Sequence, residues 1–175
     1  MSVPSALFAK LFMSKAACDK WLASPIKFVR DYDDWPRMNP EMASLYPGWR
    51  DEPQCDDFMS VAEFLSNIAD YSRHFRSWYD DVEGAYFVVD AKHGSRMAEI
   101  AASVAALRGA ENFSDVGRAG FVYVFPAIAG GDPEVLLRIE RGKSRFLFPN
   151  DSSPETLYFA NEAEEFIETM LEEEQ

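Results

Sequence analysis

The amino-acid sequence predicts an α+β fold, in which a mixed, mainly antiparallel sheet of four to five strands carries N-terminal, central and C-terminal helices. Two segments, 60–78 and 95–107, repeat apolar residues every three or four positions, which is typical of helices with one buried face. Two apolar runs rich in aromatic and β-branched residues, 85–90 and 120–125, indicate buried strands. The runs that follow are separated by short turns and therefore favour antiparallel pairing.

The N-terminal part of the chain, residues 1–58, is predicted to be helical and then irregular. Apolar residues within 5–22 recur at helical spacing. The stretch 30–58 combines four prolines with large aromatic side chains, a composition that favours an ordered loop pinned to the body of the protein. We therefore expect a single domain over 1–175, with an α+β body formed by residues 59–175.

The first helix of this body has a clear start signal. Ser60 and Glu63 stand at capping-box spacing, in which each side chain satisfies a free backbone N–H of the first turn. The strand–helix–strand unit at 85–125 predicts a right-handed parallel crossover.

The last third of the chain is predicted to add short strands and one helix. Strands are expected at 134–140, at 145–148 and, as a short fifth strand, at 157–159. Asn161 and Glu164 stand at capping-box spacing and place the start of the C-terminal helix.

Composition excludes several classes of protein. The 175 residues are 47% hydrophobic, which is enough for a packed core. A formal net charge of −13 argues against binding to nucleic-acid phosphates or to anionic membrane surfaces. No apolar run approaches the ~20 residues of a membrane span, and Cys18 and Cys55 are too few for a disulfide framework. We expect a cytoplasmic protein without nucleic-acid or membrane partners.

The sequence contains no established catalytic or cofactor motif. The glycine-rich phosphate loops, G-x-S-x-G and the Cys/His spacing of zinc sites are missing. His74 falls on the polar face of the helix predicted at 60–78, four residues after Asp70. His93 lies between a strand end and a helix start, where α/β enzymes often keep catalytic groups. We predict no cofactor, no metal and no enzymatic activity, with catalysis by His93 as an alternative.

The negative charge is concentrated in two segments. Residues 51–83 hold nine acidic and two basic side chains, and residues 151–175 hold nine acidic and no basic ones. Glu172, Glu173 and Glu174 fall at the C-terminal end of the last predicted helix, where the helix dipole is also negative. Such a surface either keeps the protein soluble or awaits a cationic partner.

Aromatic side chains are a second feature of protein interfaces, because Trp and Tyr often contribute much of the binding energy. The rings within 32–49 either form the core of a long loop or contact a partner. The predicted partner-binding residues are Trp35, Tyr46, Trp49, Asp56, Asp57, Asp80, Asp81, Glu164, Glu165, Glu168 and Glu172.

The segment 158–167, YFANEAEEFI, resembles the closing segment of SUKH-superfamily immunity domains. Those domains commonly end with a short strand, a small residue and an acidic helix that carries a Phe. The Leu-Pro-x-x-Tyr pattern of that superfamily is not evident in this sequence, and the helix at 95–107 departs from its usual run of strands. The resemblance implies a bacterial toxin-immunity protein.

These observations predict a non-enzymatic immunity protein, which would inhibit a cognate toxin with a basic face through acidic and aromatic surface. The alternatives are an acidic secretion chaperone that holds an effector partly unfolded, and an enzyme that uses His93. One criterion separates binding from solubility. Two acidic segments on one face of the molecule predict a binding surface, whereas scattered ones predict a solubilising coat.

Overall fold

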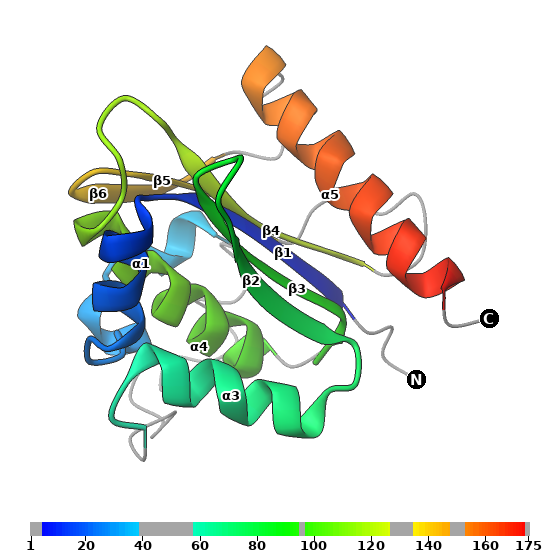
Figure 1. Cartoon of the computed structure of the whole chain (residues 1–175), viewed down its shortest axis with the longest axis horizontal. Helices are drawn as coiled ribbons and strands as arrows, with labels where there is room; N and C mark the ends of the chain where they lie inside the picture. Colours follow the sequence, from blue (N-terminus) through cyan, green and yellow to red (C-terminus); the bar gives the residue numbers. More distant parts are fainter. Residues whose placement is uncertain (1–4, 39–57, 95–96, 127–134, 148–152, 174–175) are drawn as a thin grey trace.

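The centre of the molecule is one antiparallel sheet of six strands, in the order β2-β3-β1-β4-β5-β6 (Figure 1). The computed structural model describes residues 5–38, 58–94, 97–126, 135–147 and 153–173. The fold class is α+β as predicted, with one strand more than expected and with every strand pair antiparallel. The strands are β1 (Ser5–Phe12), β2 (Phe75–Asp80), β3 (Ala85–His93), β4 (Gly120–Pro126), β5 (Val135–Glu140) and β6 (Lys143–Phe146).

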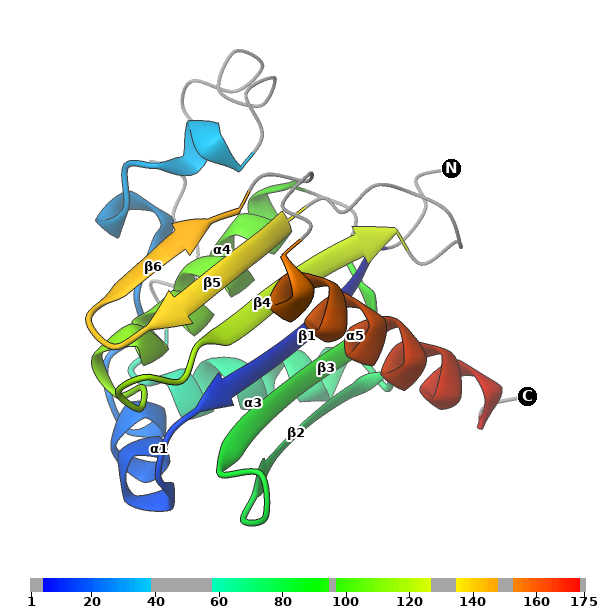
Figure 2. The ribbon, with the colours of Figure 1, turned by 90° about the horizontal axis from the view of Figure 1, so that it is seen from above.

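Helices cover both faces of this sheet (Figure 2). One face is covered by α1 (Lys15–Leu22), α3 (Val61–Tyr71) and α4 (Met97–Arg108), and the other by α5 (Pro154–Glu172). Short 3-10 helices extend the first layer: η1 (Val29–Asp31), η2 (Trp35–Arg37) and η4 (Gly109–Asn112). None of the described helices is both long and apolar enough to cross a membrane.

The prediction of a helix over residues 5–12 is wrong, because this segment is the strand β1 in the middle of the sheet. Leu7 and Leu11 face the three-helix side, whereas Phe8 faces α5, so both faces of the strand are buried. A strand buried on both faces reads as a continuous apolar run, which mimics helical spacing. The N-terminal part is therefore not separate from the α+β body.

The start of α3 is confirmed, but its predicted end at residue 78 is wrong. Ser60 Oγ accepts a hydrogen bond from the Glu63 N–H at 3.2 Å, as the capping box requires. The helix ends at Tyr71, and Phe75–Asp80 form the edge strand β2 beside β3. Trp78 faces its cross-strand partner Phe87 with ring centroids 5.0 Å apart, and such aromatic pairs stabilise a hairpin.

The unit at 85–125 is a strand, a helix and a strand, but it forms no directly paired parallel crossover. β3 and β4 are both antiparallel to β1 and lie on either side of it. They run in the same direction without sharing hydrogen bonds, because β1 fills the position between them (Figure 2).

The C-terminal helix α5 begins earlier than predicted. Ser153 Oγ accepts from the Thr156 N–H at 3.3 Å, and Pro154 occupies the first helical position, where its missing N–H costs nothing. The strand predicted at 157–159 and the helix start predicted at Asn161 are therefore wrong, since both lie inside α5. Phe159, Ala163, Ile167 and Met170 form the buried stripe of the helix.

Candidate functional site

An irregularity in the sheet brings two polar side chains of β3 to the same face. Leu7 of β1 pairs with Asp90, but Ser5, two residues earlier, pairs with His93, so β3 contains one extra residue. Strand side chains alternate between faces, and regular pairing would direct Asp90 and His93 to opposite sides. The extra residue reverses the alternation and places both on the face covered by α3 and α4.

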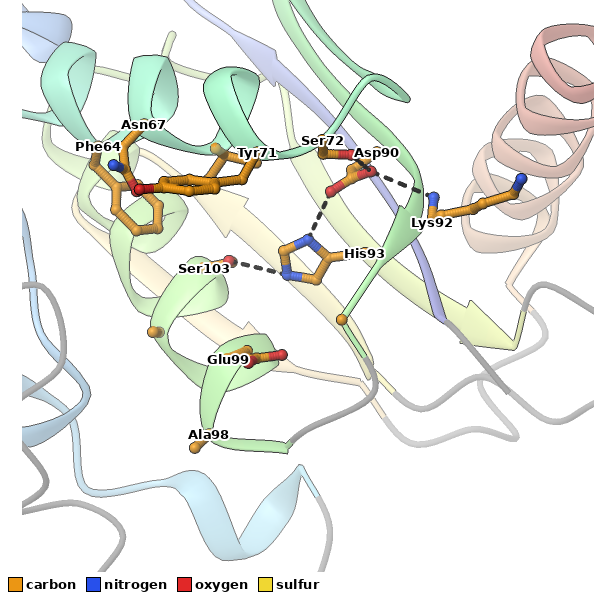
Figure 3. A pocket seen from close by; sticks show the side chains of 13 residues that line it. Phe64, Asn67, Tyr71, Ser72, Asp90, Lys92, His93, Ala98, Glu99 and Ser103 are labelled. Carbon is orange, nitrogen blue, oxygen red and sulfur yellow. Dashed lines mark hydrogen bonds and ion pairs between the residues drawn. The ribbon is translucent and has the colours of Figure 1, made fainter. Parts of the chain in front are cut away.

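Asp90, His93 and Ser103 form a continuous chain of hydrogen bonds (Figure 3). The Nδ1 atom of His93 lies 3.0 Å from Asp90 Oδ2, and its Nε2 atom lies 3.0 Å from Ser103 Oγ. With the Nδ1 proton donated to the carboxylate, Nε2 accepts from the Ser103 hydroxyl. This order of groups is that of a nucleophile, a base and the residue that orients the base.

Asp90 is held as an ion inside the protein. It is 2% exposed and accepts hydrogen bonds from Ser72 Oγ at 2.9 Å and from the Lys92 N–H at 3.3 Å, besides the one from His93. Burial opposes its ionisation, but the interactions with His93, Ser72 and Lys92 outweigh it and lower the pKa of the Asp90 carboxyl. The imidazole therefore faces a carboxylate that keeps its charge over the whole neutral range.

Ser103 reaches His93 from the inward face of α4. Ile100 and Leu107 of the same helix are buried in the core three residues before and four residues after Ser103, and Ser103 lies on their face with 5% exposure. A buried hydroxyl in an apolar stripe needs a hydrogen-bond partner, which is here an imidazole rather than a backbone carbonyl.

The Ser103–His93–Asp90 chain forms part of the wall of a pocket of about 590 Å³ between α3, α4 and the end of β3 (Figure 3). Phe64, Ile68 and Tyr71 of α3 give it an apolar wall, and Tyr71 is 86% exposed. Ligand pockets of this size with few convergent polar groups are the usual setting of binding and active sites. The Lys92 side chain points away from His93 (Figure 3). Besides the imidazole and the hydroxyl, the polar side chains of Asn67, Ser72 and Glu99 line the pocket.

Of the two histidines, His74 is placed differently from expectation and His93 is placed as predicted. His74 follows α3 instead of lying on its polar face; it is 7% exposed and receives a hydrogen bond from Arg73 Nε at 3.2 Å. His93 does lie at the end of a strand, as predicted. The sequence offered no motif for Asp90 and Ser103, although an Asp three residues before a His and a Ser within an apolar helical stripe are signals in retrospect.

The aromatic residues predicted to bind a partner do not form a described surface. Trp35 is 1% exposed, donates from Nε1 to the Val29 carbonyl at 2.8 Å and packs against Phe146, so it belongs to the core. It is therefore not available to a partner, because contact would require the loop to leave the sheet. Four other predicted residues, Tyr46, Trp49, Asp56 and Asp57, lie outside the described residues.

The described acidic residues do not gather on one face. α3 carries Glu63 and Asp70 and lies on the opposite side of the sheet from α5 (Figures 1 and 2), whereas Asp80, Asp81 and Glu83 lie at the β2–β3 turn. Asp80 caps the β2–β3 turn by accepting from the N–H groups of Val82 and Glu83, and Asp81 is exposed in that turn. On α5 the four predicted residues Glu164, Glu165, Glu168 and Glu172 are all exposed.

Lys10 connects part of this acidity to the sheet. Its Nζ atom lies 2.8 Å from Glu162 Oε1 on α5 and 3.0 Å from Glu83 Oε2 in the β2–β3 turn, and its side chain is only 7% exposed. Burial opposes protonation of Lys10, but the two carboxylates outweigh it and raise its pKa. These carboxylates therefore hold α5 and the turn against β1.

Within the described part of the chain, no group of three or more His, Cys, Asp or Glu side chains is arranged to hold a metal ion. Comparisons with protein-family models, with curated proteins and with solved structures give no match for this chain. The chemistry of the site is therefore argued from its own residues.

Proposed function

We propose that the chain is a hydrolase that works by acyl transfer, with Ser103 as the nucleophile, His93 as the general base and Asp90 as the residue that orients His93. The supporting observation is the pair of 3.0 Å contacts that join Ser103 to His93 and His93 to Asp90 in the wall of a pocket. We therefore prefer catalysis by His93, which the sequence offered as an alternative, to the predicted non-enzymatic role.

The reaction follows from the proton positions. Ser103 Oγ attacks the carbonyl carbon of an ester while its proton passes to His93 Nε2. The protonated imidazole, stabilised by the Asp90 carboxylate, then gives that proton to the departing alcohol and leaves an acyl group on Ser103. Water repeats the attack, its proton passes to Nε2, and the acid is released with Ser103 restored.

The negative oxygen of the tetrahedral intermediate needs a hydrogen-bond donor. Asn67 on the α3 wall of the pocket carries an uncharged side-chain amide, which suits this role better than a carboxylate would.

A fluorophosphonate probe tests this function directly, because it labels only a serine activated by a base. We expect the intact protein to gain one adduct on Ser103, located by mass spectrometry, and to hydrolyse p-nitrophenyl acetate. Ser103→Ala and His93→Ala should lower the catalysed rate about 10³-fold or more.

Ser66→Ala is the matched control, since Ser66 is exposed on α3 and does not line the pocket. Equal labelling and hydrolysis by Ser103→Ala and Ser66→Ala would refute the proposal. Circular dichroism of each variant separates loss of the nucleophile from loss of the fold.

A second candidate function is the predicted binding of a toxin with a basic face, through α5. Its supporting observation is that Glu165, Glu168 and Glu172 are exposed on a helix whose last turn has no basic residue, while Leu157 and Tyr158 are 51% and 70% exposed. Acidic side chains at the negative end of a helix dipole contribute nothing favourable to folding. The opposite placement of α3 limits any such surface to α5 and the β2–β3 turn.

The protein copurified with this chain from its native host provides the test. Changing the three Glu residues of α5 to Gln should slow association with that partner and flatten its salt dependence. If the wild type and the Gln variant associate with the partner at the same rate, at low salt and again at high salt, α5 is not the binding surface.

A further inference from the structure

The Ser103–His93–Asp90 chain lies between two cavities of very different size. In front is the open pocket of about 590 Å³. Behind is a cavity of about 10 Å³, which shares Phe64, Ile68, Asp90, His93 and Ser103 with the pocket but is otherwise lined by the core. The two spaces on either side of the nucleophile are therefore available to the two halves of a substrate.

The small cavity has room for one group of about the size of a water molecule or a methyl. Its inner walls are Leu7, Val88 and Leu107, which are all at most 2% exposed and belong to the central core cluster. Widening it would displace the middle of the sheet and α4, because close-packed interiors do not give way to extra methylenes without strain.

The order of events assigns each half of the substrate to one space. The leaving group must depart before deacylation, and water must enter in its place, so the leaving group belongs in the open pocket. The acyl group stays bonded to Ser103 until water attacks it, and it leaves last, as the free acid, through the space that the leaving group has vacated. The closed cavity behind the nucleophile is suited to hold it.

We infer that the site is selective for short acyl groups, acetyl above all, carried by large apolar leaving groups that pack against Phe64, Ile68 and Tyr71. This inference rests on the proposed acyl transfer and names its substrate class. Each added methylene in a pocket that cannot accommodate it lowers the rate by about tenfold or more. The chain should therefore prefer acetyl over propionyl and butyryl esters of one alcohol.

The experiment measures kcat/KM for p-nitrophenyl acetate, propionate and butyrate. Wild type should lose about tenfold per methylene. Val88→Ala enlarges the small cavity by two methyl groups and should shift the preference toward propionate. Val122→Ala is the control, because Val122 lies in the same core cluster but lines neither cavity.

The results separate this inference from the proposed function. Hydrolysis that depends on Ser103 but is equally fast for all three esters would overturn the acyl selectivity and leave acyl transfer standing. The absence of any Ser103-dependent hydrolysis or probe adduct would overturn both. A shift in chain-length preference with Val88→Ala that equals the shift with Val122→Ala would also overturn it, since the effect would then come from a loosened core.

Discussion

The two faces of the sheet each bury a charged side chain, and they neutralise it in different ways. On the three-helix face, Asp90 is satisfied by three hydrogen bonds within a chain that ends at the hydroxyl of Ser103 in the wall of a pocket. On the α5 face, Lys10 is neutralised by Glu83 and Glu162, which keep contact with water. The buried charge on the three-helix face orients a reactive group, whereas the buried charge on the α5 face attaches a helix to the sheet.

The difference teaches that burial of a charge does not by itself indicate function. Lys10 joins β1 to α5 and to the β2–β3 turn, so its role is accounted for by assembly. Asp90 aligns an imidazole whose other nitrogen contacts a hydroxyl, and assembly alone does not require that alignment. Variants that remove each charge separate these roles.

The largest expected effect on folding comes from Lys10→Ala. Its removal leaves Glu162 unpaired against an apolar sheet face and should cost about 3 kcal/mol of unfolding free energy, at the lower end for a buried ion pair because both carboxylates keep access to water. Urea denaturation measures the loss.

Lys10→Met should recover part of this stability, and Lys20→Ala, an exposed site on α1, should change little. Labelling of Ser103 should be the same in all folded variants. A large loss of labelling in folded Lys10→Ala would contradict the separation of the two faces.

Asp90→Asn should lower the stability less than Lys10→Ala does, but it should lower the reactivity of Ser103 more. The amide keeps the shape and loses the charge, so we expect a loss of about 1–3 kcal/mol at neutral pH together with poor labelling of Ser103. Because folding lowers the pKa of Asp90, its contribution is complete above the unfolded pKa near 3.9 and is lost as the pH falls through the lower, folded value.

The stability difference between wild type and Asp90→Asn should therefore be constant from neutral pH to about pH 5 and shrink below about pH 4. Urea denaturation at a series of pH values measures it. Asp81→Asn, in the exposed β2–β3 turn, serves as the control for general acid effects. A difference that grew on acidification would mean that folding does not favour the charged carboxyl.

The smallest effect is expected from changing Glu165, Glu168 and Glu172 to Gln. Removing negative charge near the C-terminal end of α5 relieves its unfavourable interaction with the helix dipole and should raise stability by about 0.3–1 kcal/mol. Thermal unfolding at low salt measures the gain, which should vanish at high salt because exposed charges are screened. A clear loss of stability would show that these residues have structural partners.

The sequence predicted correctly those elements whose residues fit the pattern of only one type of secondary structure. Ser60 and Glu63 placed the start of α3 correctly, whereas the same spacing at Asn161 and Glu164 lies inside α5. The sequence predicts helix at 5–12 and 75–78 because strand and helix spacing overlap in short apolar runs, and only cross-strand partners such as Phe87 decide between them.

The candidate site was only partly predictable, for a related reason. His93 was recognised by its place at the end of a strand, but its direction depends on the extra residue in β3, which appears only in the pairing with β1. Ser103 lies on another element, and its role follows from the distance to His93 rather than from a spacing in the sequence. Sites assembled across elements leave weak local signals.

The central position of β1 has a consequence for how the chain acquires its structure. Phe8 pairs with Val89 on one side and with Tyr123 on the other, so both ladders of β1 close long stretches of chain. Long loops cost entropy before their contacts form, whereas the β2–β3 and β5–β6 hairpins close only short turns. We therefore expect the hairpins to form early and the middle of the sheet to close late, which makes β1 both the core of the native protein and the exposed strand of its folding intermediates.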